Sequence, residues 1–522
     1  MSSRRVTVAL LAPAIVLAAV TAIYIAYTRA GIGLSPDSVF YTEGARSLAH
    51  GDGYTAFIDI TGRRAIVDFP PLYSTLLAVL DVGGIGPLAG ARLLNGGLLL
   101  ATALLVYLLT LRWTGGNRAA AVLVPALYLL SLGVLRLYGF VWTEPLFVLL
   151  VVLWALAIDG YLRRGGCSAL TAVAVLVAAS ILTRYVGVAL LLASVVAILA
   201  LGPDGRRRRL QGAGVVSAVG VLTALAWTVW TRVSGVETKY TPAFHGIEAG
   251  KLEEGIDSVS SWVFPSPVPE DARPWLLGLS LLAAVVVVVV LVLRRDRERD
   301  PRREAFGRVP GLTAMATFAA VYVGFLLFSM TFISASGRLI DRYLAPVFLV
   351  VLILVAVGLA RSSRPVRVAG FAVLLLLVVA YTVNSVDAVA REPISERGIT
   401  AKYYARSPLL DVAEAQRGRL VYSDRPETIY ANSRIRTVDL VPKKYDPYTL
   451  RANTAFDEEV RRIGSEVLAG NAVVIMWNAE KAERHDHLLT AEELVQRIDG
   501  LDSRSFPSGV VFFAASRGSP TG

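Results

Sequence analysis

Long apolar runs recur along this chain as far as residue 385, and several are long enough to cross a lipid bilayer. A transmembrane helix needs about 20 consecutive, mostly apolar residues, because a helix rises about 1.5 Å per residue across a hydrocarbon core of about 30 Å. The chain is 55% hydrophobic and 18% charged, whereas soluble proteins carry about 25% charged residues. The sequence therefore predicts an α-helical polytopic membrane protein.

Hydropathy predicts about eleven transmembrane helices. The first apolar run is longer than the roughly 7–15 apolar residues of a signal peptide, so an uncleaved first helix is predicted. The predicted spans are 6–27, 88–111, 119–138, 142–161, 168–183, 185–201, 211–231, 275–293, 311–332, 342–360 and 368–385.

Arginines in alternate short loops predict the orientation of these spans. Examples are Arg163 and Arg164, the run 206–209 and the segment 294–308. Basic residues favour the cytoplasmic side, so the N-terminus is predicted to be cytoplasmic and the C-terminal part extracytoplasmic, in a multi-pass plasma membrane protein. Because the net charge of +11 resides in these loops, it does not indicate nucleic-acid binding.

Two domains are predicted. Residues 1–385 form a transmembrane domain with two large outer loops, 28–87 and 232–274, and residues 386–522 form an extracytoplasmic domain. In the second domain short apolar segments alternate with amphipathic ones, which predicts a small α/β fold. Neither of the common glycine-rich phosphate-binding motifs occurs there. The single cysteine, Cys167, excludes an intramolecular disulfide.

The segment SPDSVFYTEGARSLAH, residues 35–50, predicts a helix in the first outer loop. Ser35 is a suitable N-cap, Pro36 suits the first helical position, and Asp37 falls in the first turn. A carboxylate there also complements the helix dipole. Asp37 is therefore predicted either to stabilise its own helix or to serve a site at the membrane surface.

Four arginines lie near the predicted outer ends of spans, against the cytoplasmic bias, and Glu144 begins the fourth span. Charges at such positions are costly and indicate function by default, and arginine is well suited to binding phosphate. The alternatives are arginines that reach outward to lipid headgroups and a salt bridge between Glu144 and Arg136 or a similar partner. The arginines are Arg136, Arg184, Arg338 and Arg342.

Four motifs occur in a fixed order between residues 30 and 345. In this order and placement they resemble the GT-C superfamily of polytopic glycosyltransferases, and most nearly the branch of the aminoarabinose transferases and protein O-mannosyltransferases. The motifs are SPDSVFYTEGARSLAHGDGY, FPPLYSTLLAVL, TEPLF and GRLIDRYLAPV. The resemblance implies an enzyme that transfers a sugar from a polyprenyl-phosphate donor to a glycan, lipid or protein acceptor.

The resemblance also implies roles for individual residues. Asp37 matches the catalytic aspartate of the first loop, and Glu144 matches a second acidic position. One position departs from the pattern, since Phe69 stands where the aminoarabinose branch often has a basic residue before the double proline. The candidates for donor phosphate binding are Arg342, Arg338, Arg184, Tyr343 and Arg136. The candidates for the acceptor site or loop are Tyr41, Asp68 and Tyr73.

Glycosyl transfer requires a base for the acceptor hydroxyl and positive charge for the leaving phosphate. Asp37 is predicted to be the base of an inverting reaction. No cofactor is required, although a divalent cation shared by Asp37 and Glu144 is left open. The alternatives are a transporter or flippase for lipid or sugar, without glycosyl transfer, and a membrane scaffold that presents the C-terminal domain. Convergence of Asp37, Glu144 and the outer arginines on one cavity would favour the enzyme.

Overall fold

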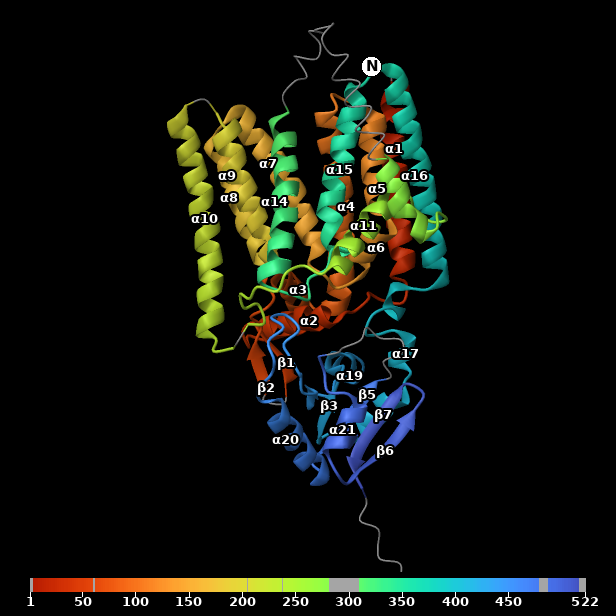
Figure 1. Cartoon of the computed structure of the whole chain (residues 1–522). Coiled ribbons are helices and arrows are strands. Elements are labelled where there is room, and N and C mark those ends of the chain that lie inside the picture. Colours follow the sequence, from red (N-terminus) through yellow and green to blue (C-terminus); the bar gives the residue numbers. More distant parts are fainter. Residues whose placement is uncertain are drawn as a thin grey trace, which may run out of the picture.

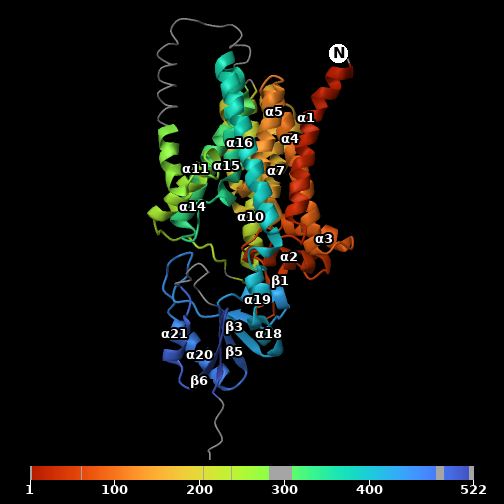
Figure 2. The same cartoon turned by 90° about the vertical axis from the view of Figure 1, so that its right-hand side faces the viewer.

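The structure is a computed structural model that describes residues 3–59, 62–203, 205–236, 238–280, 309–477 and 487–515. A bundle of long helices, here called the membrane domain, has the N-terminus at one end (Figure 1). The C-terminal domain, which follows α16 (Arg364–Arg391), lies at the opposite end. Between the two lie α2, α3 and a small hairpin, and Figure 2 shows this layer from the side. The predicted boundary at residues 385 and 386 falls inside α16.

The predicted spans that lie within the described residues coincide with helices of the membrane domain. Their bounds are α1 (Ser3–Tyr27), α4 (Pro87–Trp113), α5 (Arg118–Leu130), α6 (Leu132–Gly139), α7 (Glu144–Arg164), α8 (Cys167–Thr183), α9 (Val188–Leu201), α10 (Arg206–Val233), α14 (Pro310–Phe332), α15 (Asp341–Arg361) and α16. Among the residues that the structure describes, six helices can cross a membrane by length and hydropathy, or seven if the bent pair α5 and α6 forms one span.

The span count of eleven therefore remains a prediction. The described part of α1, and also α8 and α9, are apolar but shorter. The predicted span 275–293 and the arginine-rich segment 294–308 lie largely or wholly outside the described residues. What the structure does establish is a polytopic helical membrane domain joined to a small sheet-containing domain.

The predicted span 119–138 is broken into α5 and α6, which meet at an angle of 65°. Ser131 between them is extended, with φ −62° and ψ 128°. The hydroxyl of Ser385 in α16 donates a hydrogen bond of 2.6 Å to the Leu130 carbonyl, an acceptor that the end of α5 leaves without a helical partner. This contact joins residues 255 positions apart, so local hydropathy could not predict the break.

The first outer loop contains more structure than predicted. The predicted helix is α2 (Pro36–Ala49). A second helix, α3 (Leu72–Val82), follows the double proline, and the antiparallel strands β1 (Thr55–Asp59) and β2 (Gly62–Ala65) form a hairpin between them. The rings of Tyr41 and Tyr73 pack edge to face between α2 and α3, with centres 5.6 Å apart. The second outer loop contains α11 (Ala249–Val263), where no helix was predicted.

The C-terminal domain is built on a five-stranded sheet in the order β4-β3-β5-β7-β6. Strands β3, β4 and β5 are parallel, and β7 is antiparallel to both β5 and β6. The prediction missed β6, because its exposed middle residues are polar. The elements are α17 (Lys402–Ala405), α18 (Pro408–Ala415), β3 (Leu420–Ser423), α19 (Pro426–Ser433), β4 (Val438–Leu440), α20 (Phe456–Leu468), β5 (Ala472–Trp477), α21 (Ala491–Arg497), β6 (Leu501–Phe506) and β7 (Gly509–Ala514).

Polar contacts hold the C-terminal domain against the membrane domain. Arg434, at the end of α19, forms a salt bridge of 3.3 Å with Glu43 of α2. The amide of Ala335, after α14, donates a 2.8 Å hydrogen bond to the Tyr448 carbonyl of the C-terminal domain. Because Glu43 is only 6% exposed, its ion pair fixes the position of α19 over α2.

Candidate functional site

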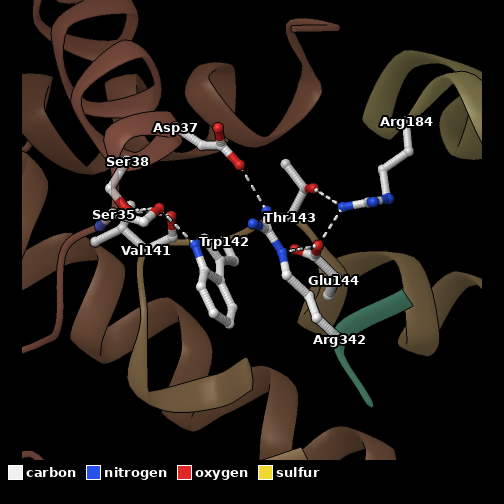
Figure 3. A network of polar contacts seen from close by, with 9 residues as sticks. All are labelled: Ser35, Asp37, Ser38, Val141, Trp142, Thr143, Glu144, Arg184 and Arg342. Atoms are coloured by element: carbon white, nitrogen blue, oxygen red, sulfur yellow. Dashed lines mark hydrogen bonds and ion pairs between the residues drawn. The ribbon is translucent and has the colours of Figure 1, made fainter. Parts of the chain in front are cut away.

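The N-terminus of α2 is fixed by hydrogen bonds to the segment that precedes α7. The Ser35 amide donates to the Ser38 hydroxyl at 2.9 Å, and the Ser38 hydroxyl donates to the Val141 carbonyl at 3.0 Å. The Trp142 indole donates to the Ser35 hydroxyl at 2.7 Å. These bonds hold Asp37, in the first turn of α2, beside the start of α7 (Figure 3).

Arg342, in the first turn of α15, bridges the two predicted carboxylates. Its Nη2 lies 2.8 Å from Oδ2 of Asp37, and its Nε lies 2.5 Å from Oε1 of Glu144 (Figure 3). Its guanidinium lies 4.1 Å from the ring centre of Trp142, where a cation–π contact supports its orientation. Three predicted residues from distant parts of the sequence, Asp37, Glu144 and Arg342, therefore meet.

Arg184, between α8 and α9, is a second partner of Glu144. Its Nη1 lies 2.6 Å from Oε1 of Glu144 and also donates to the Thr143 hydroxyl at 2.9 Å. Glu144 is 2% exposed, so two arginines compensate the burial of its charge. Within the described residues, the buried Oε2 of Glu144 and the buried Nε of Arg184 have no hydrogen-bond partner.

These residues adjoin a cavity of about 500 Å³, and Asp37, Arg184 and Arg342 line it directly. One side of the cavity is apolar and comes from the C-terminal end of α14, with Phe325, Leu326, Met330 and Ile333. The cavity thus places a charged cluster next to an apolar wall, an arrangement suited to an amphiphilic ligand with an anionic group.

Lys239, in the second outer loop, also lines the cavity and was not predicted from the sequence. Its ammonium lies 4.6 Å from the ring centre of Phe69, 5.4 Å from that of Tyr240 and 5.3 Å from that of Tyr448. The sequence did contain a feature that could have drawn attention to Lys239. Lys239 and Lys251 are the only lysines among the first 391 residues, where arginine supplies nearly all the positive charge.

Lys239 therefore lies over the residue that departs from the family pattern. Phe69 precedes the double proline, where a basic residue was expected, and the Lys239 ammonium reaches the space above its ring. Asp68 anchors this arrangement, since its Oδ1 accepts hydrogen bonds from the Thr238 hydroxyl at 2.9 Å and from the Lys239 amide at 3.1 Å. Asp68 lines the cavity and also positions the lysine.

Electrostatics set the charge state of the cavity. Burial raises the pKa of Asp37, but Arg342, Lys239 and Arg184 outweigh it and hold that pKa below its ordinary value. Burial lowers the pKa of Lys239, but its tyrosine neighbours and Asp68 outweigh this effect, so the pKa lies above the ordinary value. At neutral pH the cavity therefore contains an ionised Asp37 and a charged Lys239.

The remaining predicted residues divide into two groups. Tyr41, Tyr343 and Arg338 line the cavity, and Arg338 forms a salt bridge of 2.8 Å with Glu254. Tyr73 does not line this cavity and donates instead to the Asn95 side chain at 3.1 Å. Arg136 does not line it either and lies near Tyr27, which belongs to a separate apolar cluster.

The divalent cation shared by Asp37 and Glu144 stays a prediction, and in this structure Arg342 lies between the two carboxylates. Both carboxylates are bonded to Arg342, whose guanidinium occupies the bridging position. In the part of the chain that the structure describes, no three His, Cys, Asp or Glu side chains are grouped so that they could hold a metal ion. The positive charge between the two carboxylates comes from the protein itself.

A helical membrane domain joined to a C-terminal α/β domain is the fold that this chain shares with solved GT-C glycosyltransferases. ArnT from Cupriavidus metallidurans bound to undecaprenyl phosphate superposes with a TM-score of 0.56 at 15% identity, covering 98% of both chains. The same protein in the apo state gives a TM-score of 0.57 at 15% identity, again over 98% of both chains.

A third structure, the archaeal oligosaccharyltransferase AglB from Archaeoglobus fulgidus, in complex with an inhibitory peptide and a dolichol-phosphate, gives a TM-score of 0.53 at 12% identity. It covers 91% of this chain and 70% of that one. At these identities the likeness establishes the fold alone. No protein-family profile matches the chain, and no curated protein matches its sequence.

Proposed function

We propose that this protein is a glycosyltransferase that transfers a sugar from a polyprenyl-phosphate donor to an acceptor hydroxyl at the outer face of the plasma membrane. The observation that carries the proposal is that Asp37, Arg184 and Arg342 line one cavity that also has an apolar wall, with both arginines held by the buried Glu144. A transporter would favour charges near the middle of the bilayer, whereas Glu144 and Arg342 lie in the first turns of their helices.

The proposed donor is supported by the chemistry of the cavity and by the ligands of similar structures. The apolar end of α14 suits an isoprenoid chain, and the basic residues suit its phosphate. ArnT was solved with undecaprenyl phosphate and AglB with a dolichol-phosphate. The acceptor is proposed only as a hydroxyl of a glycan, lipid or protein.

In the proposed reaction, Asp37 takes the proton of the acceptor hydroxyl as its oxygen bonds to the anomeric carbon of the sugar. The bond between that carbon and the phosphate oxygen breaks, and its electron pair leaves with the polyprenyl phosphate. A single displacement inverts the anomeric centre. The leaving phosphate needs no strong acid, but its charge is stabilised by fixed positive groups. Glu144 holds Arg342 and Arg184 in position for this role.

Lys239 is the residue that we propose meets the donor phosphate first. Four basic residues line the cavity, and three of them already form salt bridges with carboxylates: Arg184, Arg338 and Arg342. Within the described residues, Lys239 has no carboxylate at salt-bridge distance and contacts aromatic rings instead. Its charge is therefore the one most available to an anionic ligand.

The experiment that tests this function uses membranes that contain the protein and a panel of polyprenyl phosphates carrying radiolabelled sugars. The expected result is transfer of label from at least one donor to a water-soluble, lipid or protein acceptor, with the opposite anomeric configuration. Membranes without the protein provide the control. Movement of labelled lipid or sugar across sealed vesicles without any new glycosidic bond would instead support a transporter.

A further inference from the structure

We propose that the C-terminal domain supplies one wall of the donor-sugar subsite and thereby determines which sugar is transferred. The element is a hairpin, Lys444–Asn453, whose tip residue Tyr448 lines the cavity beside Asp37 and Lys239. This inference rests on the proposed function, because it assigns a specificity residue to the same cavity.

Hydrogen bonds within the hairpin hold its shape. Tyr445 and Ala452 form an antiparallel bridge, and the Asn453 amide donates to the Lys444 carbonyl at 2.8 Å. At the tip, Oδ1 of Asp446 accepts hydrogen bonds from the amides of Tyr448 at 2.7 Å and Thr449 at 3.2 Å. A side chain on such a preformed turn loses little freedom on binding, which favours selective contacts.

The hairpin is also fixed to the membrane domain. The Tyr448 carbonyl accepts the Ala335 amide at 2.8 Å. The Tyr448 ring meets the Tyr240 ring edge to face, with centres 6.0 Å apart, and lies 5.3 Å from the Lys239 ammonium. Tyr448 therefore holds a defined position in the cavity, although it lies 411 positions after Asp37 in the chain.

The chemistry around Tyr448 fits the sugar, which is joined to the phosphate that Lys239 is proposed to meet, better than it fits the isoprenoid chain. The rings of Phe69, Tyr240 and Tyr448 surround the Lys239 ammonium, so apolar ring faces and hydrogen-bonding groups alternate within a few ångströms. A sugar ring presents the same combination of C–H faces and hydroxyls. The isoprenoid chain instead matches the wholly apolar side chains at the end of α14, on another part of the cavity wall.

The C-terminal domain thus has a function beyond attachment. The residues that act on the reacting bond come from α2, α7 and α15 of the membrane domain, whereas Tyr448 comes from a separately built domain. A change at Tyr448 can therefore alter the choice of sugar while leaving the Asp37–Arg342–Glu144 contacts intact.

The test compares Tyr448→Ala and Tyr448→Phe with the wild type, using two donors that share one lipid and differ in the sugar. Tyr445→Ala is the matched control, because Tyr445 lies in the same hairpin but does not line the cavity. For each protein kcat and KM are measured with both donors, together with inhibition by sugar-free undecaprenyl phosphate.

Even a one-methylene change in the fit of an apolar pocket alters kcat/KM by roughly 10–200-fold, and we take this factor for loss of the Tyr448 ring. We expect Tyr448→Ala to lower kcat/KM for the preferred donor by that factor and to change the ratio between the two donors by about tenfold. Tyr448→Phe should keep part of the selectivity, and Tyr445→Ala should keep the wild-type ratio. Inhibition by undecaprenyl phosphate should stay within about threefold.

An unchanged donor ratio in Tyr448→Ala, with an active wild type, would overturn this inference and leave the proposed function standing. An equal loss for both donors, accompanied by weaker inhibition by undecaprenyl phosphate, would also overturn it, because that pattern indicates a structural role. If the wild type transfers no sugar from any donor, the proposed function fails, and the inference that rests on it fails with it.

Discussion

Arg342 donates a hydrogen bond of 2.8 Å to Asp37, and this contact joins α15 to α2 across 305 positions of the chain. The same guanidinium holds Glu144 through its Nε. Arg342 therefore orients both acidic residues of the site at once, and its charge keeps Asp37 ionised. We expect the phosphate of the proposed donor to compete with Asp37 for this charge, which would couple donor binding to the proton affinity of the proposed base.

The charge state of Asp37 predicts the pH dependence of transfer. Its pKa lies below the ordinary value of about 3.9, because burial is outweighed by the positive charges of Arg342 and Lys239. We expect kcat/KM to be flat between about pH 5 and 8 and to fall only below about pH 4, as Asp37 is protonated. In Arg342→Gln the fall should move to higher pH.

The direction of this shift also fixes its effect on stability. A lowered folded-state pKa contributes stability at pH values above the unfolded pKa, and this contribution is lost as the pH falls through the folded pKa. The predicted pH dependence of activity is tested by measuring a pH profile of transfer with one donor. This interpretation of Asp37 would be contradicted if kcat/KM of the wild type already fell near pH 6 and if Asp37→Glu did not show this fall.

We expect Glu144 both to stabilise the folded protein and to be required for transfer. Its substitution by Gln leaves the buried Arg184 and Arg342 with less compensation, and removal of one partner from a buried ion pair costs about 3–5 kcal/mol. We expect Glu144→Gln to lower the thermal unfolding midpoint in detergent and to abolish transfer. The double variant Glu144→Gln/Arg184→Gln should regain part of the stability but none of the activity. If Glu144→Gln were as stable as the wild type, the ion pairs of Glu144 with Arg184 and Arg342 would not be coupled to the stability of the fold.

Lys239 is expected to act on donor affinity. A hydrogen bond to a charged group contributes about 1.5–3 kcal/mol, so Lys239→Ala should raise the donor KM by roughly 10–100-fold with a smaller change in kcat. Lys239→Arg should recover part of the affinity. Asp68→Asn should give a weaker version of the same defect, because Asp68 anchors the backbone of Lys239. Lys251→Ala is the control, since Lys251 bonds the Ala335 carbonyl instead, and an equal KM increase there would argue against a specific role for Lys239.

Chelation should have no effect on transfer. Arg342 already bridges Asp37 and Glu144, so the account requires no cation between them. Transfer rates in EDTA and in added Mg²⁺ or Mn²⁺ should agree within about twofold. A loss of activity in EDTA that is restored by one of these metals would show that a cation displaces Arg342 during the reaction.

Much of the fold is predictable from the sequence because each span is encoded locally. The runs that form α4, α7 and α15 are apolar enough to be recognised alone, and Ser35 and Pro36 mark the start of α2. Asp37, Glu144 and Arg342 could likewise be proposed from local position and family resemblance.

The features that escaped prediction depend on contacts between distant segments. The bend at Ser131 depends on Ser385, and the position of Lys239 depends on Asp68, which lies 171 residues earlier. Tyr448 lies in a loop without periodic pattern, and its place in the cavity is determined by the packing of one domain on another. Such positions are fixed by the tertiary structure and leave little local signal in the sequence.

Asp37→Asn tests most directly whether Asp37 removes the proton of the acceptor hydroxyl. Asn preserves the size of the side chain and leaves the Ser35 N-cap of α2 in place, so folding should be retained, as judged by the elution profile and thermal midpoint in detergent. The measurement is the single-turnover rate of sugar transfer with saturating donor, wild type against Asp37→Asn. The account predicts a loss of at least about 100-fold with donor binding changed by less than about tenfold. A well-folded Asp37→Asn variant that transfers sugar at a rate close to the wild type would contradict it.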